Sequence, residues 1–539
     1  MKTGKTVKVL LTAATAAGML AGCGSKTDTD TFRFASELDI QGMDSTVVDD
    51  GMSFNAIHAI TDGLTAVNEK GKTAPAIAKS WDVSDDGKTY TFHLRDAKWT
   101  NGDKVTANDF VYSWRKIIKD AGNYAYMLGS GGASVKNADA LMELGANATD
   151  EQMATLGVTA KDDQTLVVEL ENKVPYFTDL MAFPCYFPQN EKFVEKCGKN
   201  YGTKPEYTLS NGAYTMTKWI KGNKATFTKN DKYYDAKTVA TKNLEMYLVQ
   251  DPKTAAQNFD NGKVDYATIN STLVDKYKGK DTFTTFNEGY LFYLQVNFKN
   301  NTVANKNVRE ALAYAINRKD LCENVLKDGS MAATGFVPSQ LSKSPAGKDF
   351  RDDADKYVSY DQKKAQEYLD AAKKELGTDT ITIDLLYGTD ESPMDTMAEY
   401  LQGSFSKLKG LKVNMVATVK KDRIYNREAN GNFQVVCTRW GPDYADPTTY
   451  LNLALTDNSN NYGKYANAKF DALMEQIQKE SDLTKRWDLM IQAEKVMMED
   501  MAYIPVFEKG SAALKAKNVK GLVVVPVGTP YTFKYVKLK

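Results

Sequence analysis

The chain has 539 residues, which is too long for a single hydrophobic core, so two or three domains are expected. Apolar residues make up 42% and charged residues 26%, an ordinary balance that excludes a largely disordered chain. Lys plus Arg and Asp plus Glu both number 69, so there is no basic field for nucleic acid and no acidic field for cations.

The N-terminus carries the pattern of a secretory signal. Lysines before residue 9 are followed by the apolar stretch Val9–Leu20 and by small residues before Cys23. That stretch is about 12 residues long, whereas a bilayer crossing takes roughly 20. The segment Leu20–Cys23 resembles a bacterial lipobox, which implies removal of the signal peptide 1–22 and acylation of Cys23. An ordinary signal-peptidase site with an incidental cysteine is the alternative.

The segment that follows predicts a membrane tether. Residues 23–30 are too polar to join a core, so we expect them to link a folded body to the acyl chains. One acyl chain binds a membrane only marginally, so stable attachment takes two or more. The expected location is the outer face of the cell membrane, with the lipid on Cys23, in the Gram-positive manner. An anchor that faces a periplasm would leave nearly the same sequence.

From Thr31 onward the chain mixes strands with separate helices. Period-two apolar alternation predicts strands at Thr89–Arg95, Thr165–Glu171, Ala225–Thr228 and Ile381–Tyr387. Apolar stripes at helical spacing predict helices over Val308–Leu321, Asp361–Leu376 and Asp482–Met501. Strands that lie between helices in the later half indicate α/β units. These stripes are expected to be core faces.

Few residues could support metal or nucleophilic chemistry. Besides Cys23, the cysteines have no CxxC spacing and no neighbouring histidine, and they are Cys185, Cys197, Cys322 and Cys437. Disulfides and free thiols both remain open for them. The chain has 2 His and no GxSxG or HExxH motif. We therefore predict no metal, no cofactor and no catalytic residue, and a binding protein rather than an enzyme.

A specific resemblance comes from Ala78–Trp114, which contains Trp81, the turn Asp85-Asp86-Gly87 and Trp99-Thr-Asn-Gly-Asp103. This segment resembles the signature of family 5 extracellular solute-binding proteins. Further family motifs follow in the expected order at Val174–Phe177, Ser210–Tyr214, Val308–Arg318 and Trp440–Pro447. The resemblance covers essentially the whole mature chain and is greatest to the oligopeptide branch. Most of the signature consists of residues that form turns or pack in a core, so its tryptophans are expected in the core.

The resemblance implies an α/β, periplasmic-binding-protein-like fold (class II, cluster C), in which two lobes close about a hinge and carry an extra small domain. Lobe I is then discontinuous, comprising 31–63, 187–289 and 511–539. The extra domain is 64–186, and lobe II is 290–510. The implied function is to bind oligopeptides and deliver them to the permease subunits of an ABC transporter, as a monomer. Alternatives are another solute (a nickel chelate, haem or an oligosaccharide) and the sensing of a peptide pheromone.

A receptor for many peptides must hold what all peptides share. A buried ammonium needs a paired carboxylate, and an extended ligand backbone can join the edge of a strand. The resemblance assigns the ligand amine to Asp443 and backbone contacts to Arg439 and Gly441, which flank Trp440. The alternative for Asp443 is an ordinary turn residue beside Pro442.

Three further contacts are implied by the same resemblance. The strand that contains Tyr293 and Gln295 would supply the facing edge, and an aromatic side chain of Asn123–Tyr126, taken as Tyr124, would approach from the other side. The loop Asp49-Asp50-Gly51 of the first lobe would lie alongside. The basic residue that meets the ligand carboxylate aligns poorly, and the candidates are Arg423, Arg427 and Arg439.

Overall fold

The computed structural model describes residues 29–539. The predictions for the signal peptide 1–22, for Cys23 and for nearly all of the tether therefore lie outside the described residues. Within the part of the chain that is described, no helix combines the length and the apolar character that a membrane crossing requires.

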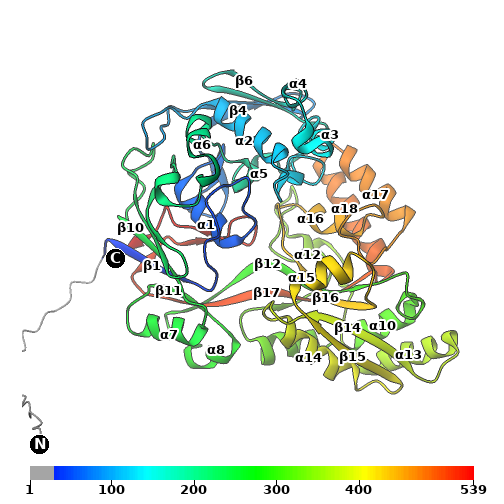
Figure 1. Ribbon diagram of the computed structural model, residues 1–539. Coiled ribbons are helices and arrows are strands. Elements are labelled where there is room, and N and C mark those ends of the chain that lie inside the picture. Colours follow the sequence, from blue (N-terminus) through cyan, green and yellow to red (C-terminus); the bar gives the residue numbers. More distant parts are fainter. Residues whose placement is uncertain (1–28) are drawn as a thin grey trace, which may run out of the picture.

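One mixed sheet of 11 strands runs through the molecule (Figure 1). In spatial order its strands are β15 (Leu411–Thr418), β14 (Ile381–Gly388), β16 (Val435–Trp440), β12 (Phe283–Val296), β17 (Tyr503–Lys515), β11 (Tyr266–Ile269), β1 (Thr31–Ser36), β10 (Asn243–Leu248), β9 (Lys224–Lys229) and β8 (Tyr214–Ile220), with β13 (Met331–Ala332) paired to β17. The mixed α/β architecture agrees with the expected fold class.

Two long strands, β12 and β17, join the two halves of this sheet. The first part of β12, Phe283–Asn287, pairs with Gly510–Leu514, and the later part, Leu291–Gln295, pairs with Tyr503–Glu508. The register shifts between these parts, where Gly289 has φ +80°. The chain therefore passes between the halves twice, in adjacent antiparallel strands.

Each half has its own hydrophobic cluster. On the β1 side, α1 (Gly51–Ile60) packs with aromatic side chains such as Phe34 and Tyr531. On the β14 side, the cluster gathers the inner faces of α10 (Lys306–Ala315), α13 (Gln362–Leu376), α14 (Met394–Phe405), α17 (Ala468–Lys479) and α18 (Leu483–Glu499).

A third cluster surrounds a separate four-stranded sheet at the top of Figure 1. Its strands, in order, are β4 (Ala78–Val83), β5 (Thr89–Leu94), β7 (Thr165–Glu169) and β6 (Val158–Asp162), and α2 (Ala107–Lys119) packs on it. Trp99 and Trp114 are fully buried there, as the sequence predicts. This cluster also contains Tyr444, which comes from the other half of the molecule.

The shorter elements connect these layers. They are β2 (Thr65–Val67), β3 (Thr73–Pro75), α3 (Ala138–Leu144), α4 (Asp150–Met153), α5 (Phe177–Leu180), α6 (Glu191–Cys197), α7 (Pro252–Asp260), α8 (Ser271–Tyr277), α9 (Asn301–Ala304), α11 (Arg318–Asp320), α12 (Phe350–Asp353), α15 (Lys420–Asp422), α16 (Thr448–Leu451), β18 (Val519–Lys520), β19 (Val523–Val524), β20 (Tyr531–Thr532) and β21 (Lys537–Leu538).

Most of the predicted elements form within a residue or two of their expected bounds, as β5, β7, β9, β14, α13 and α18. In α13, the Asp361 side chain accepts from the backbone of Lys364 and Gly377 closes the helix at φ +64°. The single helix predicted over Val308–Leu321 is wrong, because α10 ends at Ala315. The buried Arg318 guanidinium donates to carbonyl oxygens near the break, and its bond to Pro505 requires the chain to turn there.

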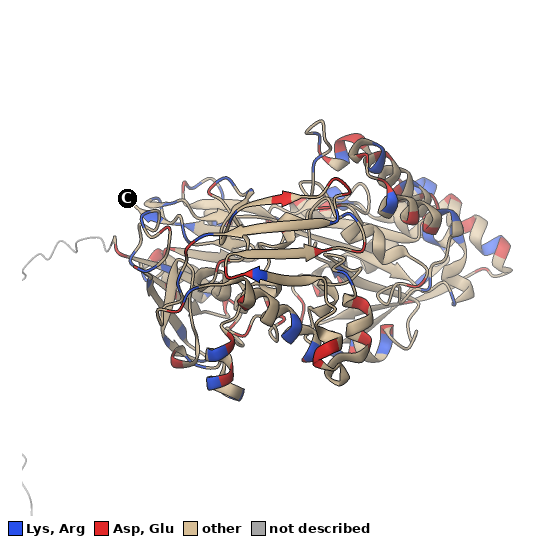
Figure 2. Ribbon diagram, turned by 90° about the horizontal axis from the view of Figure 1, so that it is seen from above, with Lys and Arg blue, Asp and Glu red and all other residues tan. Residues whose placement is uncertain are grey.

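The four described cysteines, Cys185, Cys197, Cys322 and Cys437, are free thiols. His93 lies on β5 and pairs with Asp82 at the surface, as its place on an alternating strand predicts. Figure 2 shows acidic and basic residues interspersed along helices and loops, which agrees with the balanced composition.

Candidate functional site

Asp443 lies directly beyond β16, where the two halves and the small sheet domain meet. Its backbone N–H donates to Thr449 Oγ1 (3.2 Å), and its half-buried carboxylate accepts from the hydroxyl of Tyr126. Burial raises the pKa of Asp443 to about 7, and the Tyr126 bond offsets only part of this effect. Among residues 29–539, Tyr126 is the one group that lowers this pKa, so the carboxylate has no cationic partner there.

Aromatic rings surround this carboxylate. Burial, and then the charge of Asp443, raises the pKa of the Tyr124 and Tyr126 hydroxyls and of the Cys185 thiol. The Tyr124 and Tyr126 rings lie 5.8 Å apart, and Tyr290 approaches from β12. A carboxylate among aromatic side chains is well suited to an ammonium group, because cations are attracted to carboxylates and to aromatic rings.

The loop before α1 reaches the same region. Asp49 accepts from the Asn123 side chain (2.7 Å), so the loop lies beside the segment that carries Tyr124. Asp50 caps α1 through Ser53 N (2.8 Å), and its Oδ2 is buried without a hydrogen-bond partner. Gly51 is exposed at the first turn of α1.

The end of β16 offers an unpaired strand edge. Arg439 and Trp440 pair with β12 on one side, but on the other side β14 pairs with β16 only at Val435 and Val436. No strand within residues 29–539 covers the stretch beyond Val436 on that side. The Trp440 Nε1 atom is buried there without a partner.

Gly441 is required by close packing. A Cβ atom on Gly441 would lie 2.5 Å from Tyr290 Cε1, so the ring of Tyr290 rests against the glycine backbone. Tyr290 was not among the predicted ligand contacts. Tyr126 could have been found, because it lies in the same short motif as Tyr124.

Tyr293 and Gln295 do not lie at a strand edge, so this part of the predicted site is wrong. Their strand, β12, is paired on both sides, with β16 and with β17. The Tyr293 ring packs edge-on against Phe336 and Tyr503 and is 4% exposed, and Gln295 donates to Asn460 O and is 2% exposed. The nearly continuous apolar run from 291 to 296 indicates a strand that is covered on both faces, but it does not tell which strands pair with its edges.

The three candidate arginines differ in what they contact. Arg423 is buried, and its guanidinium is bound by Glu391 (2.9 Å) and by Glu428. Arg427 pairs with Asp422 at the surface. Arg439 lies 3.5 Å from Glu391 and 4.8 Å from the centroid of the Tyr290 ring, and Tyr290 is one of the aromatic residues near Asp443. Of the three, Arg439 is therefore the best placed to meet an anion in this region.

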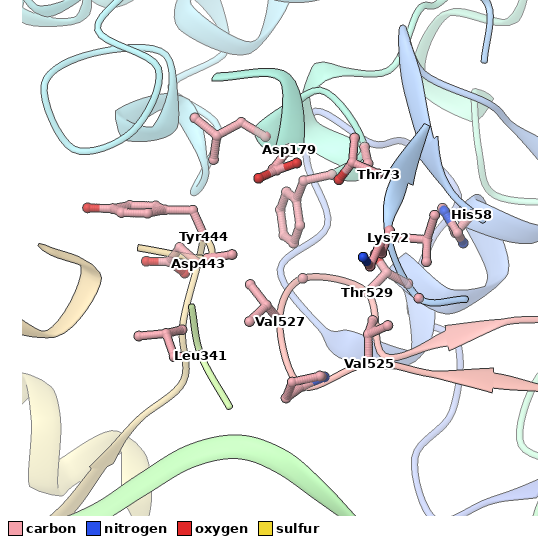
Figure 3. Close-up of a pocket in the computed structure, with 18 of the residues that line it drawn as sticks. His58, Lys72, Thr73, Asp179, Leu341, Asp443, Tyr444, Val525, Val527 and Thr529 are labelled. Carbon is pink, nitrogen blue, oxygen red and sulfur yellow. The ribbon is translucent and has the colours of Figure 1, made fainter. Parts of the chain in front are cut away.

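A separate cavity of about 320 Å³ lies behind the chain segment 443–445 (Figure 3). Its walls come from the β2–β3 turn with Lys72, from α5 with Asp179 and from the turn 525–529. In Figure 3 the Asp443 carboxylate points away from Val527 and Thr529 on the opposite wall. Asp443 is therefore among the residues that line this cavity, with its carboxylate turned away from the opposite wall.

Residues 29–539 contain no group of three His, Cys, Asp or Glu side chains that could hold a metal ion. What they do contain is an acid without a cation, with aromatic side chains near it, beside an open strand edge and between two halves joined by two strands. These are the features of a two-lobe receptor for a ligand that carries a positive charge and a backbone able to form hydrogen bonds.

The chain belongs to the bacterial extracellular solute-binding proteins of family 5, whose model (Bacterial extracellular solute-binding proteins, family 5 Middle) matches residues 72–462. Members of this family are binding receptors rather than enzymes. The dipeptide-binding protein of Lactococcus lactis subsp. cremoris (strain MG1363) is 33% identical over 561 residues, covering 100% of each chain.

Solved structures agree with this family. The Listeria monocytogenes OppA bound to peptide has a TM-score of 0.79 and 33% identity, covering 95% of this chain and 99% of its own. The pheromone receptor PrgZ has the same TM-score with 30% identity, covering 95% and 99%. The fold predicted from sequence is therefore confirmed as a two-lobe solute-binding fold.

Proposed function

We propose that this protein is a lipid-anchored, extracytoplasmic receptor that binds peptides by their free N-terminus and passes them to an ABC-transporter permease. The observation that carries the proposal is Asp443, a carboxylate among aromatic rings that no cation of residues 29–539 stabilises. A buried charge without a partner is costly, so such a site is completed by a cationic ligand. The α-ammonium of a peptide supplies that charge in a form that every peptide shares.

Two neighbouring features fit the rest of a peptide. The open edge of β16 can pair with an extended ligand backbone, which binds peptides without reading their side chains. Arg439, held between Glu391 and Tyr290, is placed to meet a ligand carboxylate. Tyr124 and the loop Asp49–Gly51 close the pocket from the other side.

Closure is assigned to the two connecting strands. We place the hinge at the register shift of β12 and at the matching point of β17, with lobe I as 31–63, 187–289 and 511–539, lobe II as 290–510 and the extra domain as 64–186. A ligand favours the closed form only through contacts that are better there than in the open form.

The lipid anchor and the membrane partner rest on the sequence pattern and on the family. Acylation at Cys23 would hold a monomeric receptor at the outer face of the cell membrane, next to its permease. Changing Cys23 to Ala is expected to release the folded protein from the membrane fraction and to abolish labelling by a radioactive fatty acid. A variant that remained membrane-bound and labelled would contradict the anchor.

The binding proposal is tested by identifying what the purified protein retains. We expect mass spectrometry of the denatured protein to reveal peptides with free N-termini in the wild type and far fewer in Asp443→Asn. Retention of a nickel chelate, haem, an oligosaccharide or another solute in place of peptides would overturn it. A single retained sequence would instead favour the sensing of a peptide pheromone, the alternative suggested by similarity to PrgZ.

A further inference from the structure

Tyr444, the residue next to Asp443, makes a close contact between lobe II and the extra domain. The Tyr444 ring stacks face to face on Tyr176, with centroids 4.3 Å apart and planes 1° apart. Tyr444 is 3% exposed and belongs to the hydrophobic cluster of the extra domain, although its backbone follows β16 of lobe II. Neither ring is needed to explain how a ligand is held.

The Tyr444 side chain is also held by hydrogen bonds within lobe II. Asn452 donates to its hydroxyl (3.2 Å), and the Thr448 hydroxyl lies 3.3 Å from it. Thr448 in turn donates to Asp446 (2.6 Å), which Arg486 of α18 binds through two nitrogens at 2.6 and 2.9 Å. This buried ion pair holds the loop after β16 and thereby fixes the position of the Tyr444 ring.

Tyr176, on the extra domain, is also held in place by its neighbours. Tyr176 precedes α5, and its carbonyl oxygen accepts from the backbone N–H groups of Asp179 and Leu180. Phe177 beside it is fully buried and anchors the segment in the extra domain. The Lys173 side chain adds a second, exposed contact to the carbonyl oxygen of Ser481 in lobe II.

The stack and the ligand site share one short segment. Asp443 and Tyr444 are adjacent, and both meet the extra domain, Asp443 through Tyr126 and Tyr444 through Tyr176. A movement that separated the lobes would break both contacts together. The stack therefore stabilises this arrangement of the lobes in a way that does not depend on which ligand is bound.

We propose that Tyr444 and Tyr176 form a closing clasp. They are positioning residues that set the population of the closed form and thereby scale the affinity for every ligand. This inference rests on the proposed function only for its binding readout. Apparent affinity is the intrinsic affinity multiplied by the fraction of closing-competent protein, so loss of the clasp weakens all ligands by one common factor.

The test uses Tyr176→Ala, Tyr444→Ala, the double variant and Tyr444→Phe, with the exposed Tyr360→Ala as the control. Calorimetry with two unrelated free-amine peptides is expected to show that each Ala variant is weaker by roughly tenfold for both peptides. The double variant is expected to be no weaker than one single variant, because both remove the same stack. Tyr444→Phe keeps the stack and is expected to stay within about threefold of the wild type.

Unequal factors for the two peptides, additive losses in the double variant or unchanged affinity would each overturn the clasp. Tyr176 is only half-buried, so its Ala variant keeps the proposal testable if Tyr444→Ala fails to fold. If the wild type binds neither peptide, the peptide proposal fails and small-angle scattering of ligand-free protein decides about the clasp. A larger radius of gyration in Tyr176→Ala than in the wild type then supports it, and an equal radius refutes it.

Discussion

Asp443→Asn tests the central acid with almost no change of shape. In this structure, burial raises the pKa of this carboxyl from its ordinary 3.8 to about 7. Each pKa unit corresponds to about 1.4 kcal/mol, so keeping Asp443 ionised costs the fold at most about 4 kcal/mol. The cost is smaller than this limit because the side chain keeps part of its exposure to water.

The sign of the effect on folding follows from proton binding. Between pH 4 and pH 7 the folded protein keeps a proton on Asp443 that the unfolded chain releases, so the stability contributed by this group falls as the pH rises. Asparagine has no proton to lose. We therefore expect Asp443→Asn and wild type to have similar Tm values at pH 4, and the ligand-free variant to have the higher Tm at pH 8.

Asp443→Asn should weaken ligand binding, although it stabilises the fold at high pH. The ionised carboxylate pairs with the ammonium of a peptide, and removing one member of a buried pair costs about 3–5 kcal/mol, or a loss of affinity of roughly 150- to 4,000-fold. An N-acetylated peptide lacks the ammonium and should lose far less. The assays are thermal unfolding across pH and calorimetry with the free and acetylated forms of one peptide.

The matched control is Asp179→Asn, which removes a carboxylate from the cavity on the other side of the 443–445 segment. It should leave the affinity for both peptides unchanged. Burial also raises the pKa of Asp179, so this variant controls the binding measurement and not the pH dependence of stability. The reasoning would be refuted if Asp443→Asn bound the free-amine peptide within threefold of wild type. It would also be refuted if the Tm difference between variant and wild type were the same at pH 4 and pH 8.

Three further outcomes follow from the same structure. Because the ligand takes up the ionised form of Asp443, whose pKa is about 7, wild-type affinity should fall below pH 7 in calorimetry, while Asp443→Asn should show no such fall. Arg439→Gln should weaken the binding of a peptide with a free C-terminal carboxylate more than the binding of its C-terminal amide. Arg427→Gln, which breaks only a surface ion pair, should affect the binding of both peptides equally. Equal losses for the two peptides in Arg439→Gln would exclude Arg439 from the carboxylate role. Gly289→Ala should lower Tm well below Gly279→Ala, because both positions have positive φ but only at Gly289 would the new Cβ atom collide with the Pro526 carbonyl; similar Tm values would show that the contact can relax.

Features that depend on nearby residues could be predicted from the sequence, whereas features that depend on distant residues could not. Helix α13 could be predicted with both ends, because Asp361 and Gly377 act on backbone groups within a few residues. Asp443 could be proposed as the candidate acid because it lies in a short family motif, and the structure places it among aromatic side chains without a cation. In contrast, the end of α10 depends on the bond from Arg318 to Pro505, which is far away in sequence.

The sequence by itself determined the family, the expected fold, most of the strands and helices and the candidate acid, since these depend on spacing within short segments. Only the tertiary structure decided that β16, and not β12, has an open edge, because pairing with β14 and β17 involves distant parts of the chain. It also decided that Tyr444 packs in the extra domain. No local pattern encodes which surfaces meet when lobes come together, since that depends on the shape of both partners.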